Sequence, residues 1–387
     1  MSSEKILHIA PDEKFINAAD YLYEKAFPGK NTFFIIKPAA NPPLKHVELK
    51  DHFEIHVRSP ELDDILLNAA DKYRIIVLHG LNNTMLELFK RSDNKEKFIW
   101  TFWGAEVYNS DLYNQPIFGP KTQALENKLQ KPTLLDFAKS IYRKIRYYHL
   151  DDREDLDKVK LLKEFKYIAK LNKNVTPLKA CGVLANDCRV VPFTYYPLEF
   201  LFNDLQRKVN GNNILLGNSS STTNNHLEMI DFLAELDLNG RQVVTPLSYG
   251  SKKYASTIAK YGKKKLGSSF YPLTEFLPLY EYHDLIQHCS IVIMNHYRPQ
   301  GVGTNLATLY MGAKVFLNET SFYEYLKDIG CHVYSIKDDL LSNPANALKE
   351  LKPGEIDENR KILEQEISTK AVVENLKSSF QRFFNFV

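Results

Sequence analysis

The stretch IVIMNHYRPQGVGTNLATLYMGAKVFLN, residues 291–318, holds a strand, a turn, a helix and a second strand in succession. A continuous apolar run comes first and predicts a buried strand. The glycine-rich turn Gln300–Asn305 opens a helix, and the apolar residues 313–319 predict the next strand. Buried apolar strands joined by helices are typical of a parallel sheet that is covered on both faces.

The same alternation continues on both sides of this stretch. In the N-terminal half, helical patterns at 14–26 and 82–89 lie among apolar runs that predict strands at 6–10, 33–37, 74–80, 98–104 and 181–185. In the C-terminal half, the predicted strands are 213–219, 241–247, 290–296, 313–319 and 331–336. The predicted fold class is therefore α/β, with two parallel-sheet units in tandem.

A passage rich in proline and aromatic residues, VVPFTYYPLEF at 190–200, separates the two series. The chain has 387 residues, which suits two domains because single cores stop growing near roughly 250–300 residues. We expect an N-terminal domain over 1–195 and a C-terminal domain over 196–370. A final helix, about 356–385, has an aromatic end, and we expect its residues 371–387 to pack back on the N-terminal domain.

Composition and charge exclude several classes of protein. The formal net charge of +3 predicts no strong field for nucleic acid, and no apolar run reaches the roughly 18–20 residues of a membrane span. The N-terminus lacks the long apolar stretch of a secretion signal. Zinc-ligand spacing is absent among the four cysteines, which we interpret as reduced residues of a cytoplasmic protein: Cys181, Cys188, Cys289 and Cys331.

Two charged segments have competing interpretations. The stretch KSIYRKIRYYHL at 139–150 mixes basic and aromatic residues, which suits either an anionic membrane surface or an exposed helix with buried tyrosines. We therefore expect a cytoplasmic protein that could bind the inner face of the cytoplasmic membrane peripherally. Asp155 and Asp157 form a DxD pair of the type that binds metal in some sugar transferases, but their charge-dense surroundings favour a solvated helix face.

The turn after residues 290–296 has the features of a diphosphate site. Arg298 lies beside a glycine-rich turn at a helix N-terminus, where free backbone N–H groups attract anions. Leu306 occupies the third glycine position of the dinucleotide fingerprint, and no GK[ST] sequence follows, so neither better-known phosphate motif applies. A glycine turn needed only for tight packing is the structural alternative. The candidate phosphate-binding residues here are Asn295, Arg298, Gln300, Gly301, Gly303 and Thr304.

A second helix start, in ILLGNSSSTTNNHLEMI at 214–230, has similar chemistry. Gly217 permits close backbone approach, and Asn218, Ser219 and Thr223 can donate hydrogen bonds to phosphate oxygens. An ordinary strand–turn–helix with an N-cap explains the pattern equally well. Tyr249 follows the strand at 241–247, where it could stack on a base or contact a phosphate.

The predicted strands of the N-terminal half end in possible acid–base residues. Asp12, His79 and Glu106 each follow such a strand and could deprotonate a hydroxyl nucleophile, or could instead be structural caps. Trp103 and Gly104 precede Glu106, and the indole could stack on a sugar face. These residues form the candidate opposite wall of a cleft between the two sheets.

On these motifs the chain resembles the bacterial TDP-N-acetylfucosamine:lipid II N-acetylfucosaminyltransferases of enterobacterial common antigen assembly. In the N-terminal half the resemblance is thinner, and the family often carries Asp at the position of Glu106. The chain departs from the family in the loop 219–224 and in the basic region 139–174. In the C-terminal half the similar residues are the LLGNS turn, Asn225, His226, Leu227, Glu228, Tyr249, residues 298–304, Leu317, Asn318 and Phe322.

The resemblance implies two facing Rossmann-like domains of the GT-B type, with no required metal or cofactor. It implies a TDP-sugar donor in the C-terminal domain, where His226 and Tyr249 would help position it, and a lipid-linked sugar acceptor at the N-terminal domain. Arg298 would offset the charge of the leaving diphosphate. A nucleotide-sugar epimerase of the same build and a non-catalytic sugar-nucleotide-binding protein are the alternatives.

Overall fold

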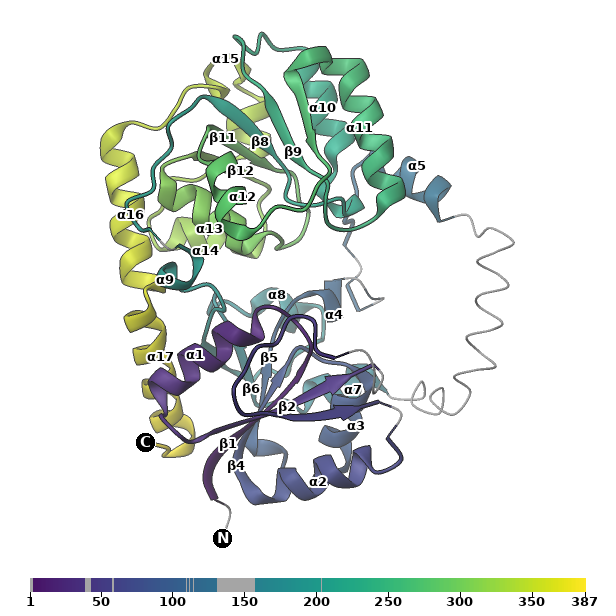
Figure 1. Cartoon of the computed structure of the whole chain (residues 1–387), viewed down its shortest axis with the longest axis vertical. Helices are drawn as coiled ribbons and strands as arrows, with labels where there is room; N and C mark the ends of the chain where they lie inside the picture. The colour runs from purple at the N-terminus through teal and green to yellow at the C-terminus, as the bar shows by residue number, and fades with distance from the viewer. Residues whose placement is uncertain are drawn as a thin grey trace. The chain divides into compact units, whose positions relative to one another are not determined.

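The computed structural model describes residues 3–38, 43–57, 59–108, 110, 112–113, 115–130, 157–202 and 204–387 (Figure 1). The chain divides into two units. Unit 1 contains Met1–Asn114, Leu134–Phe200 and Ile367–Val387, and unit 2 contains Gln115–Thr133 and Leu201–Glu366. Each unit is built around one parallel sheet, so the α/β class predicted from the apolar runs is confirmed.

Unit 1 has a seven-stranded sheet in the order β3-β2-β1-β4-β5-β6-β7, with every pairing parallel. Its central strands β4 and β5 are buried along most of their length and mainly apolar, as expected of strands between two helical layers. The strands are β1 (Ser3–Pro11), β2 (Asn31–Lys37), β3 (Phe53–His56), β4 (Tyr73–His79), β5 (Phe98–Thr101), β6 (Tyr167–Lys170) and β7 (Arg189–Pro192).

Two hydrophobic clusters cover the two faces of this sheet. One contains Leu7, Ile76 and Trp100 together with α2 (Leu62–Lys72), α3 (Asn83–Arg91), α7 (Lys158–Lys163) and α8 (Thr176–Ala180). The other contains Ile6 and Ile75 and packs against α1 (Ile16–Ala26) and α17 (Thr369–Phe384). Alternate residues of each strand therefore serve opposite layers.

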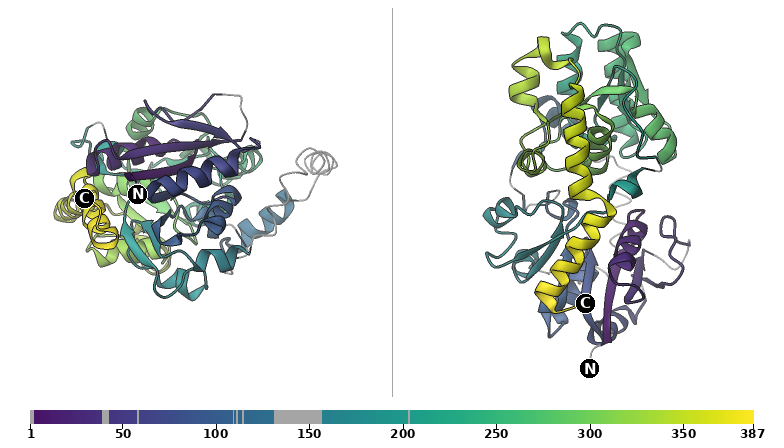
Figure 2. Two further views of the ribbon diagram at one scale, coloured as in Figure 1. Left: turned by 90° about the horizontal axis from the view of Figure 1, so that it is seen from below. Right: turned by 90° about the vertical axis from the view of Figure 1, so that its left-hand side faces the viewer.

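The C-terminal segment forms two helices where the sequence predicted one. The helix α16 (Pro353–Ile367) is followed by Ser368, whose side chain accepts a hydrogen bond from the Ala371 N–H and so caps the start of α17. Within unit 1, α17, the yellow helix that ends near the C-terminus in Figure 2, packs against α1. Phe380 and Phe386 contact Phe27, which follows α1. The aromatic end of the chain is thus part of the unit 1 core.

Unit 2 has a six-stranded parallel sheet in the order β10-β9-β8-β11-β12-β13. Its strands are β8 (Asn213–Leu216), β9 (Val243–Pro246), β10 (Phe270–Leu273), β11 (Cys289–Met294), β12 (Lys314–Leu317) and β13 (Tyr334–Ser335). Its longer helices are α10 (His226–Ala234), α11 (Lys252–Leu266), α12 (Leu279–Ile286), α13 (Val302–Met311), α14 (Ser321–Asp328) and α16. The helices α10 and α11 share a hydrophobic cluster with Leu216 and Ile291 on one sheet face.

Both sheets reverse their strand order next to the first strand. Counted within each unit, the order begins 3-2-1-4-5-6, so β1 lies beside β4 in unit 1 and β8 lies beside β11 in unit 2. In open parallel sheets ligands bind beyond the carboxyl ends of the strands at such a reversal. The residues that follow β8 and β11 are therefore the first place to look for a ligand site.

The strand predicted at 181–185 is wrong. These residues form a turn after α8, in which Val183 and Leu184 both donate their N–H to the Leu178 carbonyl. Their side chains are buried in the core without strand pairing, which is why the apolar run misled the prediction. The sheet instead gains β6 and β7, whose four-residue lengths give little periodicity.

One segment of the N-terminal half belongs to unit 2. Residues Gln115–Thr133 leave unit 1 after β5, and their helix α5 (Pro120–Leu129) packs against α10. Leu125 and Leu129 contact the hydrophobic cluster of unit 2. The joint near residue 200 is therefore one of several points where the chain passes between the units.

Candidate functional site

The turn after β8 is built around a glycine that no other residue can replace without strain. Gly217 has φ +70°, and a Cβ placed on it would stand 2.5 Å from Nε2 of His226 and 2.7 Å from Oδ1 of Asn224. The next residue, Asn218, donates its N–H to Asn224 Oδ1 over 2.9 Å. The backbone of this turn is thus held against the start of α10.

The turn after β11 leads to a second helix start. Gly301 adopts a left-handed conformation, φ +66°, as the N-cap of α13, and its carbonyl accepts the Asn305 N–H over 2.9 Å. The first N–H groups of a helix have no acceptor within the helix, and the helix dipole gives this end a partial positive charge. The loop 295–305, which we call the phosphate loop, therefore ends in backbone groups suited to an anion.

The two turns are hydrogen-bonded to each other. Thr223 donates its hydroxyl to Gln300 Oε1 over 2.6 Å, and Gln300 Nε2 reaches Asn218 Oδ1 over 3.4 Å. A Cβ on Gly301 would lie 3.2 Å from the Asn218 side chain. Sequence reasoning selected both turns separately, and the structure brings Asn218, Gln300 and Gly301 into one place.

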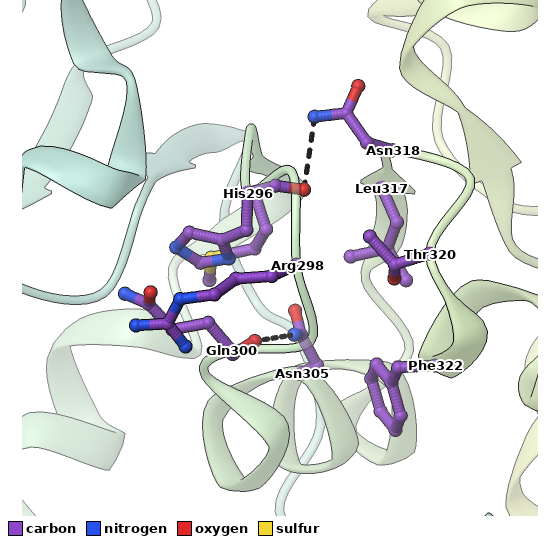
Figure 3. Close-up of a pocket in the computed structure, with 9 residues that line it drawn as sticks. His296, Arg298, Gln300, Asn305, Leu317, Asn318, Thr320 and Phe322 are labelled. Carbon is purple, nitrogen blue, oxygen red and sulfur yellow. Dashed lines mark hydrogen bonds between the residues drawn. The ribbon is translucent and has the colours of Figure 1, made fainter. Parts of the chain in front are cut away.

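A small, partly open pocket lies beside the phosphate loop (Figure 3). Arg298 and Gln300 lie on one side of it, and Leu317, Asn318 and Thr320 lie on the other. Met294, His296, Asn305 and Phe322 complete the lining.

Positive charge in this pocket comes from Arg298 and the helix start, because the nearby histidines are neutral. Burial lowers the pKa of His226 and that of His296 to about 3 each, and for His296 the Arg298 charge acts in the same direction. His296 Nε2 lies 2.9 Å from Asn224 Oδ1, and His226 Nδ1 lies 3.1 Å from the Tyr254 hydroxyl. Both rings therefore hold the turns in position rather than carry charge.

The other phosphate-site candidates have different positions. Ser219 is buried and accepts a hydrogen bond from Asn224 Nδ2 over 3.1 Å, so its hydroxyl serves the turn. Asn295 contacts Asn225 and Asn318 and does not line the pocket. Tyr249 is 74% exposed, and its carbonyl accepts from the Ser220 N–H over 2.7 Å.

Gly303 and Thr304 lie in the first turn of α13, as predicted from the glycine-rich sequence. Sequence reasoning missed Met294, Asn305 and Thr320 as pocket residues. Met294 is the last residue of β11, and Thr320 lies just after the carboxyl end of β12. The rule that ligands bind at those ends could have selected them.

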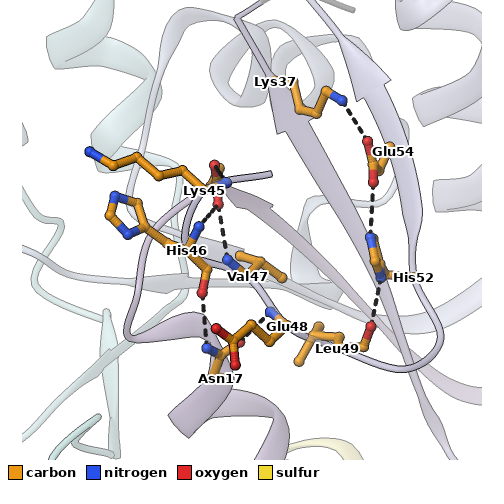
Figure 4. Close-up of polar contacts among 10 residues, drawn as sticks. Asn17, Lys37, Lys45, His46, Val47, Glu48, Leu49, His52 and Glu54 are labelled. Atoms are coloured by element: carbon orange, nitrogen blue, oxygen red, sulfur yellow. Dashed lines mark hydrogen bonds and ion pairs between the residues drawn. The ribbon is translucent and has the colours of Figure 1, made fainter. Parts of the chain in front are cut away.

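In unit 1, Asp12 holds a loop. Its carboxylate accepts hydrogen bonds from the backbone N–H groups of Lys45, His46 and Val47, over 2.6, 2.9 and 3.0 Å. Asn17 donates to the His46 carbonyl and fixes the same loop (Figure 4). Partial burial raises the pKa of Asp12, but the hydrogen bonds from these three N–H groups lower it, and the net shift of the pKa is downward. An aspartate with a lowered pKa and this many donors is a weak base.

His79 is enclosed in a buried network at the end of β4. Its Nε2 lies 3.0 Å from His8 Nδ1, and its Nδ1 lies 2.6 Å from the hydroxyl of Tyr195. Trp103 Nε1 donates to the same hydroxyl over 3.1 Å. Burial lowers the pKa of His79 well below its usual value and that of His8 to about 3. Both nitrogens of His79 are engaged inside the protein, which favours a structural role.

Glu106 differs from the other two candidates. It accepts hydrogen bonds at one oxygen, Oε1, from the Trp103 N–H and from Trp100 Nε1, over 2.9 and 3.1 Å. Burial raises the pKa of Glu106 despite these donors. Gly104, with φ +91°, makes the turn that places the carboxylate at the start of α4 (Ala105–Tyr108). A carboxylate with a raised pKa is better matched to proton transfer near neutral pH.

The buried histidines predict a loss of stability in acid. His8, His226 and His296 have folded-state pKa values of about 3, below the value near 6.5 of an unfolded chain. Between these values the unfolded chain binds protons that the folded protein does not, so stability falls as the pH drops from 6.5 toward 3. Each histidine contributes up to about 1.4 kcal/mol per pH unit.

We therefore expect the free energy of unfolding, measured with urea, to be several kcal/mol lower at pH 5 than at pH 7. A His8→Asn variant should show a shallower dependence on pH. Equal free energies at the two pH values for the native chain would contradict the account of buried neutral histidines.

Several predicted features lie outside the described residues, namely Asp155 and the basic stretch 139–150. Asp157 is described, and it caps α7 by accepting the Lys160 N–H over 3.0 Å. Within the described ranges, no group of three or more His, Cys, Asp or Glu side chains could hold a metal ion. The helices in that part of the chain include none long and apolar enough to cross a membrane.

Comparison with known proteins agrees with this geometry. Residues 193–351 match the model of the 4-alpha-L-fucosyltransferase glycosyl transferase group 56 family. The matched segment includes the phosphate loop and the turns after β8 and β11. This match confirms the resemblance to fucosaminyltransferases drawn from the sequence motifs. No curated protein sequence matches the chain at a significant level.

Solved structures of GT-B glycosyltransferases share the fold of both units. Sucrose-phosphate synthase (tll1590) from Thermosynechococcus elongatus has a TM-score of 0.63 at 11% identity, with 98% of this chain and 99% of that chain covered. Anabaena Alr3699/HepE in complex with UDP-glucose has a TM-score of 0.61 at 10% identity, covering 98% and 99%. A glycosyltransferase from Rickettsia africae ESF-5 has a TM-score of 0.60 at 13% identity, covering 99% of each chain.

Proposed function

We propose that this chain, which has the fold of the GT-B glycosyltransferases and a match to a fucosyltransferase family over residues 193–351, moves a sugar from a TDP-sugar to a hydroxyl of a lipid-linked or other glycan acceptor. The sugar we propose is an amino-deoxy sugar such as N-acetylfucosamine, in bacterial surface polysaccharide assembly. The match of residues 193–351 to a fucosyltransferase family supports a deoxy-sugar donor. A nucleotide-sugar donor is also supported by the complex of the similar HepE with UDP-glucose.

The single observation that carries the proposal is the joined pair of helix starts in unit 2. Arg298 and the N-terminus of α13 would bind the diphosphate. Gln300 and Asn218, which are hydrogen-bonded to each other, would hold the phosphate loop in place and contact the diphosphate. As the sugar–phosphate bond breaks, negative charge grows on the leaving diphosphate, and a fixed guanidinium stabilises that charge. Tyr249, exposed beyond β9, is available to stack on the base.

On the acceptor side we propose Glu106 as the general base, with Trp103 beside it as a surface for the acceptor sugar. The Glu106 carboxylate would take the proton of the attacking hydroxyl as the new glycosidic bond forms. Asp12 and His79 would support this wall through the loop at Lys45–Val47 and the buried histidine network. The basic stretch 139–150 would favour binding to an anionic membrane that carries the acceptor.

Thermal unfolding with a panel of nucleotides tests the donor. A ligand that binds only the folded protein raises the unfolding midpoint, by an amount set by its affinity. We expect TDP and TDP-sugars to raise the midpoint more than UDP, GDP or ADP at the same concentration. A shift that is the same for all four nucleotides would contradict a TDP-specific site.

Product analysis separates the proposed transfer from the other two functions. A transferase consumes TDP-sugar and releases TDP only when an acceptor is present. An epimerase would give an isomeric nucleotide sugar or a free sugar without acceptor, and a binding protein would consume nothing. Incubation of TDP-sugar with and without a lipid-linked acceptor, followed by chromatography of the nucleotides, distinguishes these outcomes.

A further inference from the structure

We propose that residues 115–130 form a strap that fixes the shape of the phosphate loop, and that Asn225 and Glu228 are the positioning residues that fasten it. The strap comes from the N-terminal half of the sequence but belongs to unit 2. The relevance of this arrangement to sugar transfer rests on the proposed function. The fastening itself is seen in the contacts between α5, α10 and the phosphate loop.

Glu228 fastens the strap to α10 at the start of α5. Its carboxylate accepts hydrogen bonds from both the N–H and the hydroxyl of Thr122, over 2.9 and 2.6 Å. Thr122 is fully buried. A Cβ on Gly119 would lie 2.5 Å from Glu228 Oε1, so a side chain there would displace the carboxylate from Thr122. The carboxylate acts as a cap for the N-terminus of α5, supplied by another helix.

Asn225 joins the strap to the phosphate loop. Its Oδ1 accepts the Gly119 N–H over 2.9 Å, and its Nδ2 donates to the carbonyls of Ile117 and Asn295 over 3.2 and 3.0 Å. Asn295 returns a hydrogen bond from its Nδ2 to the Asn225 carbonyl over 3.2 Å. Asn225 is fully buried with φ +51°, so its side chain is committed to this junction.

The hydrogen bonds continue from the junction to the wall of the pocket. Asn318 donates from Nδ2 to Asn295 Oδ1 over 2.8 Å and to the His296 carbonyl over 3.2 Å. His296 and Asn318 both line the pocket that contains Arg298. A continuous set of buried and partly buried hydrogen bonds therefore runs from the strap, through Asn225 and Asn295, to the residues that would face the diphosphate.

This path gives the strap a role beyond packing. Along the chain, the strap follows the turn that holds Trp103 and Glu106, the proposed acceptor side. A short length of chain thus connects the proposed base to the element that holds the phosphate loop. Loosening the strap should weaken donor binding although no strap residue lines the pocket.

An Asn225→Gly variant tests the junction, because glycine keeps the left-handed backbone without strain and removes only the side chain. We expect the amides of residues 296–303 to exchange with deuterium at least about tenfold faster than in the native chain, under conditions where the variant is folded. We also expect TDP affinity to fall about tenfold, with the donor KM rising and kcat changing less than about threefold.

Matched variants separate fastening from general damage. Thr122→Val removes the hydroxyl bond to Glu228 and should speed the same exchange, whereas Thr122→Ser should restore native rates. Lys128→Ala changes an exposed side chain of α5 and should leave exchange and TDP affinity unchanged. Wild-type exchange rates at 296–303 in both Asn225→Gly and Thr122→Val would overturn the proposal. If the native chain does not bind TDP, the proposed function fails while the exchange rates still decide the role of the strap.

Discussion

Replacing Arg298 with Ala is expected to lower kcat/KM for the TDP-sugar by roughly 10²–10³, the usual effect of removing one stabilising group from a developing negative charge. Arg298 lines the pocket, is 9% exposed and lies near the neutral His296, so on the proposed function its guanidinium is the charge that would face the diphosphate. Steady-state kinetics with saturating acceptor measure the change.

Arg298→Lys is the informative partner of this variant. Lysine keeps the positive charge but loses the planar fork that binds two phosphate oxygens at once, so we expect partial activity between that of the native chain and Arg298→Ala. His332→Gln serves as a control, since His332 lies at the surface beside Glu358. Native kcat/KM in Arg298→Ala would remove Arg298 from the donor site.

Replacing Glu106 with Gln is expected to lower kcat by roughly 10²–10⁴, the range for loss of a general base. Because burial raises the pKa of Glu106, kcat of the native chain should fall on acidification through a pKa above the usual glutamate value. The base must be deprotonated to act, so activity is present above this pKa and lost below it. The Gln variant should lack this acid limb.

Two further measurements isolate the chemistry of Glu106 from its role in the turn. Glu106→Asp keeps a carboxylate, and we expect it to retain much more activity than Glu106→Gln. Since Oε1 also accepts from the Trp103 N–H, the thermal midpoints of both variants show whether the turn survives. Equal activity in Glu106→Gln and the native chain would exclude Glu106 as the base.

The general course of the fold follows from the sequence, because buried parallel strands are apolar throughout. Runs such as 33–37 and 74–80 coincide with β2 and β4 for this reason. The run at 181–185 failed because a buried turn after a short helix carries the same apolar residues. An apolar run shows that a segment is buried, but it does not show that the segment pairs with a neighbouring strand.

The candidate site was partly visible in the sequence. Gly217 and Gly301 predicted turns in which the backbone comes close to neighbouring groups, and both residues have positive φ. The roles of Asp12 and His79 could not be predicted, because their partners at Lys45–Val47 and Tyr195 lie far away along the chain. The strap was hidden for the same reason, since Gly119 and Asn225 are 106 residues apart.

Calorimetric titration with TDP tests the central claim that the helix start after β11 binds the diphosphate of the donor. We predict saturable binding to the native chain and a loss of at least about 100-fold in affinity in the double variant Arg298→Ala, Gly303→Val, which removes the charge and crowds the first turn of α13. The double variant should keep its far-UV circular dichroism spectrum. Equal TDP affinity for the native chain and the folded double variant would contradict the claim.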